Sequence, residues 1–233
     1  MLMKIVLGDV LIDLTQKEIK NVHLSVNPPK GDVRISAPFS MNIDAIRAFA
    51  ISKIPWIKFE QKKFLTQERE SLREYLDRES HYVWGQRYMM EIVEVDNTPA
   101  VELKHSKLVL HIRPNTTKEK CKEMLETWYR MQIKIAAPEI IKKYSSRLQV
   151  NVERLYVQGM KTRWGGANPA RKSIRLNTDL ARKPSIYLDY VVLHEMVHFI
   201  EPTHNARFSA LMDLHMPNWK QYRDELNKLP LKC

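Results

Sequence analysis

The sequence predicts an α+β protein with a β-rich N-terminal region, long charged helices, a middle antiparallel segment and a C-terminal region that combines strands with an apolar helix. Two observations predict this class. Short runs rich in β-branched and aromatic residues, bounded by turn signals, fill residues 2–37 and 81–113. Between and after them, over residues 42–78 and 116–148, apolar residues recur at the spacing of helices.

The first strands have the pattern of a β-hairpin. Val22–Val26 and Val33–Ser36 are β-branched runs on either side of a turn that contains proline and glycine. From residue 42 the hydrophobic period becomes helical, and Ser40 is the expected N-cap. Pro55 interrupts this pattern because proline lacks the N–H that a helix interior uses. We therefore expect a helical insertion over about 42–78, broken near Pro55.

The middle of the chain predicts a boundary near residue 115. The strands within 81–113 are expected to pair antiparallel. Thr116 or Thr117 can cap the long helix that follows, and Pro138 should kink or divide that helix. We therefore expect a β-rich region over residues 1–115 and a second region over 116–233.

Two strands and a basic loop come before the apolar helix. Leu155–Val157 and Ser173–Leu176 have strand composition, and residues 161–166 between them form a basic loop with paired glycines. The helix opens at Pro184, with Ser185 as the expected N-cap.

Composition limits the classes of protein. A chain of 233 residues buries a sufficient core without disulfides, and Cys121 and Cys233 have no spacing typical of a metal knuckle, which favours a reducing, cytoplasmic compartment. No segment is apolar over the length that crosses a bilayer, so we expect a soluble protein without a membrane partner. The net charge of +11 attracts polyanions, which admits nucleic acid among the partners.

An H-E-x-x-H pattern lies in the apolar helix. The separation of His194 and His198 places both imidazoles on one helical face, one turn apart, where they can bind one ion. Glu195 stands beside the first ligand, and its carboxylate can reach a metal-bound water and accept its proton as general base. The pattern therefore predicts a metal-dependent hydrolase.

His204 is the expected third ligand. Pro202 should end the helix and turn the chain back toward the metal. The spacing from His198 to His204 equals that of the long three-histidine zincin motif, although Glu201 replaces the usual midway glycine. We expect one Zn²⁺ ion per chain in a zincin-like catalytic region with an antiparallel sheet. The fallback ligands are Asp213, His215 and Glu225.

A basic segment before the helix indicates how substrate could bind. Seven basic residues and one acid, Asp179, lie between Lys161 and Lys183, which predicts an anion-attracting lip. The candidate substrate-binding residues are Lys161, Arg163, Trp164, Arg175 and Asn177.

Three functions fit these residues. The first is a zinc metallopeptidase in which metal-bound water attacks a peptide bond and an extended substrate pairs with the strand that contains Trp164. The second is a metal-dependent nucleoside triphosphate pyrophosphatase that uses the same site, motivated by the basic lip. The third is a nucleic-acid-associated protein with structural zinc, which Glu195 disfavours because a structural site has no use for a general base.

The C-terminal third resembles the YgjP-like metallopeptidase-type family. The resemblance is carried by the segments Thr162–Gly165, Ile174–Asn177 and His194–His198, followed by His204 and Phe208. It implies a zincin-like fold, three histidine ligands and Glu195 as the catalytic residue. The family usually continues Arg-Trp-Gly with Ser-Cys, whereas this chain has glycine and alanine, so no role of that hydroxyl or thiol carries over.

Overall fold

The computed structural model describes residues 2–27, 31–66 and 77–229. The chain forms two compact units, Met1–Arg69 and Glu70–Lys232. Each unit has its own core of buried hydrophobic residues. The boundary expected near residue 115 stays a prediction. The strands before it and the helix after it contribute to the same core of the second unit.

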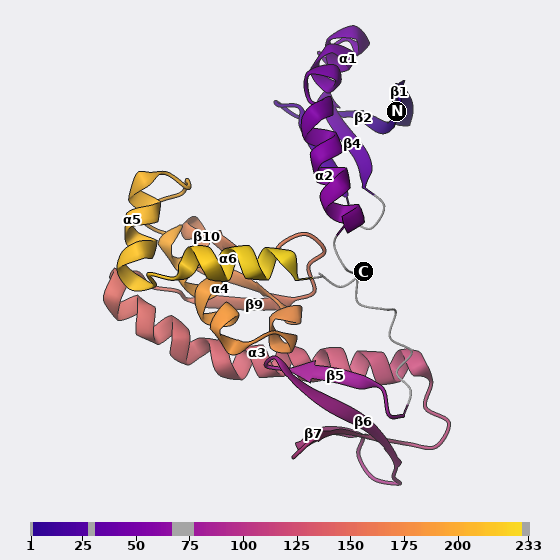
Figure 1. Ribbon diagram of the computed structural model, residues 1–233, viewed down its shortest axis with the longest axis vertical. Helices are drawn as coiled ribbons and strands as arrows, with labels where there is room; N and C mark the ends of the chain where they lie inside the picture. The colour runs from indigo at the N-terminus through magenta and orange to yellow at the C-terminus, as the bar shows by residue number, and fades with distance from the viewer. Residues whose placement is uncertain (1, 28–30, 67–76, 230–233) are drawn as a thin grey trace. The chain divides into compact units, whose positions relative to one another are not determined.

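The first unit is a four-stranded sheet with two helices, drawn in indigo and purple in Figure 1. The sheet has the order β1-β2-β4-β3, and the expected hairpin is confirmed because β3 and β4 pair antiparallel. β2 and β4 in the centre are parallel. The elements are β1 (Leu2–Leu7), β2 (Val10–Lys17), β3 (His23–Asn27), β4 (Asp32–Pro38), α1 (Ile43–Ser52) and α2 (Ile54–Thr66).

The ends of these helices differ in part from the prediction. The N-cap of α1 is Asn42, whose side chain accepts a hydrogen bond from the N–H of Ala45 at 2.8 Å, so the prediction of Ser40 was wrong. Pro55 lies in the first turn of α2, where its missing N–H costs nothing, and the expected break between two helices is confirmed. The predicted continuation of α2 over residues 67–76 lies outside the described residues, and Arg78 is in a turn.

The second unit begins with a sheet of mixed direction. Its strands are β5 (Ser80–Val83), β6 (Gln86–Glu94), β7 (Ala100–Lys104) and β8 (Lys107–Ile112), in the order β5-β6-β8-β7. The prediction of purely antiparallel pairing was wrong because β6 and β8 are parallel. β8 carries three consecutive buried apolar residues, so it occupies an inner position between β6 and β7.

A single long helix, α3 (Lys118–Leu148), extends along this unit, as Figure 1 shows. Thr117 is its N-cap, as predicted, and accepts a hydrogen bond from the N–H of Lys120 at 3.3 Å. Of the two predicted effects of Pro138, division of the helix is wrong, because α3 runs through the proline without interruption. Buried residues on both sides of the proline, including Ile133 and Tyr144, hold the two halves against one core, which offsets the lost hydrogen bond.

A three-stranded sheet supports the apolar helix. β9 (Arg154–Gln158) and β11 (Ser173–Asn177) confirm the two predicted strands and are parallel. The expected basic loop, however, contains a third strand, β10 (Gly165–Asn168), which pairs antiparallel with β11 and forms one edge of the sheet. Short 3-10 helices, η1 (Pro169–Arg171) and η2 (Thr178–Arg182), flank β11.

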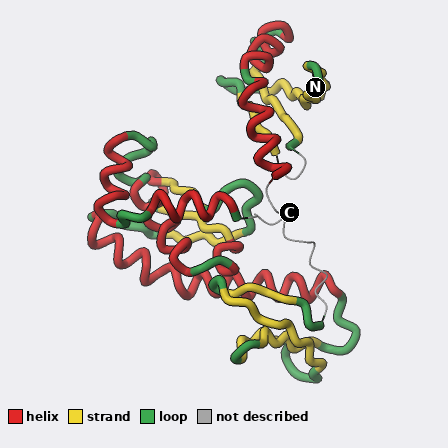
Figure 2. Tube along the Cα trace, in the orientation of Figure 1, coloured by secondary structure: helices red, strands yellow, loops and turns green. Residues whose placement is uncertain are grey.

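Three helices complete the second unit: α4 (Ser185–Val197), α5 (Ala206–His215) and α6 (Trp219–Lys228). Figure 2 shows these helices in red around the yellow strands. Ser185 is not an N-cap, contrary to the prediction, because α4 begins at that residue and Pro184 occupies the cap position. Among the helices the structure describes, none is both long and apolar enough to span a membrane.

Candidate metal centre

Helix α4 provides a rigid support for the H-E-x-x-H residues. Nine of its residues are buried, which is typical of a helix enclosed by its own protein. His194 faces the pocket from its last turn, and His198 is its C-cap residue. The two rings lie one turn apart, with their centroids separated by 4.9 Å.

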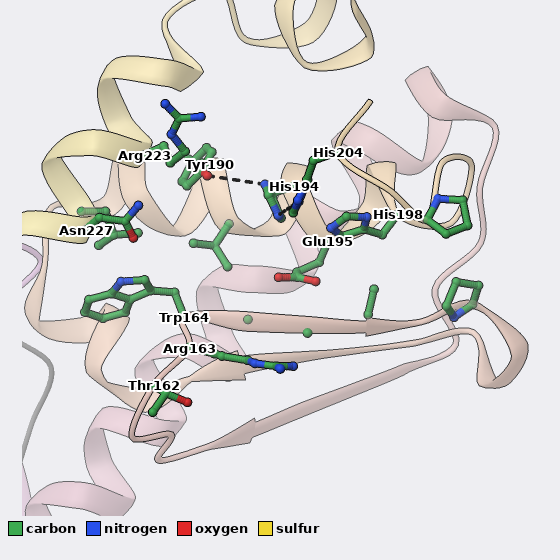
Figure 3. A pocket seen from close by; sticks show the side chains of 17 residues that line it. Thr162, Arg163, Trp164, Tyr190, His194, Glu195, His198, His204, Arg223 and Asn227 are labelled. Carbon is green, nitrogen blue, oxygen red and sulfur yellow. Dashed lines mark hydrogen bonds between the residues drawn. The ribbon is translucent and has the colours of Figure 1, made fainter. Parts of the chain in front are cut away.

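Three histidines converge at the end of this helix. The possible ligand atoms of His194, His198 and His204 all lie within 4.8 Å of one another. The Nε2 atoms of His194 and His204 are 3.1 Å apart, and Figure 3 shows the three rings together above Glu195. Among the described residues, the fallback ligands Asp213, His215 and Glu225 do not join this cluster. Asp213 accepts a hydrogen bond from Trp219, and Glu225 accepts one from Tyr187.

The start of helix α5 positions His204. Asn205 is the N-cap of α5 and accepts a hydrogen bond from the N–H of Phe208 at 3.0 Å. The ring of Phe208 is buried, and its centroid lies 5.0, 4.9 and 4.6 Å from those of His194, His198 and His204. One aromatic side chain therefore packs against all three imidazoles. Sequence reasoning quoted Phe208 only as part of the family pattern and assigned it no role.

The Nδ1 atoms of His198 and His194 both have hydrogen-bond partners. Nδ1 of His198 lies 3.1 Å from the carbonyl oxygen of Glu201, which can only accept, so this nitrogen carries the proton. Nδ1 of His194 lies 3.4 Å from the hydroxyl of Tyr190, as the dashed line in Figure 3 marks. The carbonyl partner leaves the lone pair of His198 on Nε2, and the hydroxyl partner of His194 is compatible with the same arrangement, which is usual around metal-binding histidines.

The donor set fits a zinc ion. Zn–N bonds of about 2.0–2.1 Å at a tetrahedral angle place two ligand nitrogens about 3.3 Å apart, close to the 3.1 Å between His194 and His204. Burial, helped by the neighbouring His198 and His204, lowers the pKa of His194 to about 3. Burial also lowers the pKa of His198. Neutral imidazole is the form that binds metal.

Glu195 lies beside the histidines with its carboxyl group enclosed. The residue is 7% exposed, and burial raises the pKa of its carboxyl group to about 8, while the charge of Arg163 acts in the opposite direction. The edge strand β10 approaches this group closely at Gly165. A Cβ atom at Gly165 would lie 2.5 Å from Oε1 of Glu195 and 2.8 Å from Cγ1 of Val191. Only glycine leaves room for the carboxylate at this position.

A cavity of about 610 Å³ opens over the metal centre. Arg163 and Trp164 line it from the strand side, and Tyr190, Arg223 and Asn227 line it from helices α4 and α6 (Figure 3). Sequence reasoning missed the last three. A hydroxyl-bearing aromatic one turn before the first histidine was a signal for Tyr190, whereas nothing in the sequence connects α6 to the site.

The other predicted substrate-binding residues do not line this cavity. Lys161 and Arg175 are exposed elsewhere, the latter on β11. Asn177 is fully buried, and its amide donates to the carbonyl oxygens of Met160 at 2.9 Å and of Arg163 at 2.8 Å. Asn177 therefore holds the loop that carries Arg163.

The predicted basic lip is shorter in the structure. Arg182 and Lys183 are buried rather than solvated. Arg182 forms ion pairs with Asp179 and Glu126, and its guanidinium carbon lies 4.0 Å from the ring centroid of Tyr129. This end of the segment therefore attaches η2 to α3 instead of attracting anions.

Comparisons with known proteins agree with the motif. The family model described as "YgjP-like, metallopeptidase domain" matches residues 20–229. No curated protein matches. Among solved structures, the metallopeptidase zymogen jannalysin of Methanocaldococcus jannaschii is 19% identical, with a TM-score of 0.35, and the match covers 39% of this chain and 92% of that one. The zymogen abylysin of Pyrococcus abyssi is 15% identical, with a TM-score of 0.36 and coverage of 39% and 90%. Because the family model spans most of the sequence, the chain belongs to the YgjP-like metallopeptidase domain family.

Proposed function

We propose that the chain is a zinc-dependent peptidase with one ion per chain, held by His194, His198 and His204. The observation that carries the proposal is the convergence of the three imidazoles beside the carboxyl group of Glu195 in one cavity. A zinc ion bound there would polarise the substrate carbonyl and lower the pKa of water.

Glu195 is the proton-transferring group in this proposal. Its carboxylate accepts a proton from the attacking water and donates it to the departing amine nitrogen. Val191 and the bare backbone of Gly165 enclose the side chain, which limits the orientations open to the carboxylate. The Glu201 carbonyl, which can only accept, keeps the proton of His198 on Nδ1, so that its Nε2 lone pair is available, and the hydroxyl of Tyr190 can accept from Nδ1 of His194 in the same way.

The edge strand β10 supports a peptide as the substrate. It pairs with β11 on one side only, and its residues Gly165, Gly166 and Ala167 line the cavity. An extended peptide can add to such an edge through main-chain hydrogen bonds, which places a peptide bond along the side of the cavity that faces Glu195.

Cleavage of peptides by zinc-loaded protein tests the proposal. We expect a quenched-fluorescence peptide library and casein to be cleaved by the wild type and not by Glu195→Gln, a variant that retains the three histidines. Treatment with a chelator should abolish cleavage, and added zinc should restore it. Turnover of nucleoside triphosphates with no cleavage of any peptide would contradict the proposal.

A further inference from the structure

Two arginines stand on different sides of the cavity. Arg163 comes from the loop before β10, and Arg223 comes from α6, close to Tyr190 and His194 in Figure 3. Apart from the histidines, the charged residues that line the cavity within the described part of the chain are these two arginines and Glu195. The remainder of the lining is neutral, with Trp164 and Asn227 among it.

Both arginines line the cavity that contains the reacting groups. The charge of Arg163 acts on Glu195 and opposes the effect of burial on its pKa. The guanidinium carbon of Arg223 lies 5.2 Å from the ring centroid of Trp219, at the α6 side of the cavity. Each arginine therefore lines the space in which a substrate side chain beside the scissile bond would lie.

Both arginines have donors left for a ligand. Within the described residues the guanidinium group of Arg163 has no hydrogen-bonded or ion-paired partner, whereas its carbonyl oxygen accepts from Asn177. Arg223 donates from Nε to Asp224 at 2.9 Å, a bond within one helix between exposed groups. Its terminal nitrogens remain available for the bidentate contact that a guanidinium makes with a carboxylate.

We propose that Arg163 and Arg223 select peptides with an aspartate or glutamate next to the scissile bond. This inference rests on the proposed peptidase function and names its substrate class. A zinc ion at the three histidines would add further positive charge to the same cavity, so a lysine or arginine side chain would be repelled there. Both arginines are therefore specificity-determining residues.

A binding experiment tests the inference separately from cleavage. The Glu195→Gln variant, loaded with zinc, is titrated with fluorescent peptides that differ by a single Asp or Asn at each position around the centre. We expect the Asp peptide to bind on the order of tenfold more tightly at one or more positions, as a charge-assisted hydrogen bond allows. Arg163→Gln or Arg223→Gln in this background should remove the preference at the position it reads.

Arg154→Gln is the matched control, because Arg154 is exposed on β9 at the opposite edge of the same sheet. It should leave the preference unchanged. In the wild type the ratio of kcat/KM for Asp over Asn peptides should follow the same pattern. This ratio cancels any general loss of catalysis in the Arg163 variant. In the Arg223→Glu variant, a peptide with lysine at the position that Arg223 reads should be preferred over the Asp peptide.

The outcomes separate the two proposals. Asp and Asn peptides that bind within twofold of each other at every position would overturn the inference, even if both are cleaved. A preference that survives in both arginine variants would also overturn it. A preference for Asp in binding without cleavage of any peptide would support the selectivity and overturn the proposed peptidase function instead.

Discussion

Replacing Gly165 with alanine should impair catalysis while the metal stays bound. The new Cβ atom would lie 2.5 Å from Oε1 of Glu195, whereas ordinary contacts begin near 3.4 Å, so the carboxylate or the strand must move by about 0.9 Å. A misplacement of this size typically lowers a rate by about 10²-fold, equivalent to about 2.7 kcal/mol in the activation barrier. The three atoms nearest the new Cβ belong to Glu195 and Val191 and not to a histidine, so zinc stoichiometry should stay at the wild-type value.

Gly166 offers a matched control on the same strand. A Cβ atom there meets nothing within 4 Å, so Gly166→Ala should keep the wild-type kcat. The assay measures kcat and KM with one peptide substrate, zinc content by atomic absorption, and Tm. A Gly165→Ala variant with wild-type kcat and unchanged Tm would refute the reasoning, and so would equal losses in both alanine variants.

Three further predictions concern groups around the site. Tyr190→Phe removes the oxygen that faces Nδ1 of His194, so zinc affinity measured by competition with a chelator should fall about 10–100-fold; unchanged affinity would contradict the role of the hydroxyl. Asn177→Ala leaves the carbonyls of Met160 and Arg163 without their donor, so urea unfolding should show a loss of about 2–3 kcal/mol, and a loss below about 0.5 kcal/mol would argue against it. The thiol of Cys121 is 4% exposed and burial raises its pKa, so in a Cys233→Ser background a disulfide reagent should modify it only as fast as the protein unfolds, whereas rapid modification at neutral pH would disprove its burial.

The cluster of three histidines was predictable because its signal is local. The i, i+4 spacing of His194 and His198 fixes their geometry as soon as the segment is helical, and the proline at residue 202 predicts the turn that brings back His204. The α+β class also follows from local patterns, since β-branched runs and helical periods are both read within short windows.

Features that depend on distant partners were not predictable. β10 begins with two glycines, which carry no apolar alternation, and it is a strand because β11 pairs with it. Arg182 reads as a surface charge in sequence, yet its partner Glu126 lies 56 positions earlier on α3. Arg223 likewise lines the cavity because α6 packs against α4, and no motif encodes that packing.

The ring of Phe208 packs against histidines from both the end of α4 and the start of α5. His194 and His198 belong to the first segment, and His204 belongs to the second, so an ion held by all three cross-links the chain across the turn at Pro202. The free energy of binding that ion would also stabilise the docking of α5, because the chain with α5 undocked offers only two of the three ligands. An ion bound by all three histidines would therefore stabilise the docking of α5, and its removal would weaken that docking.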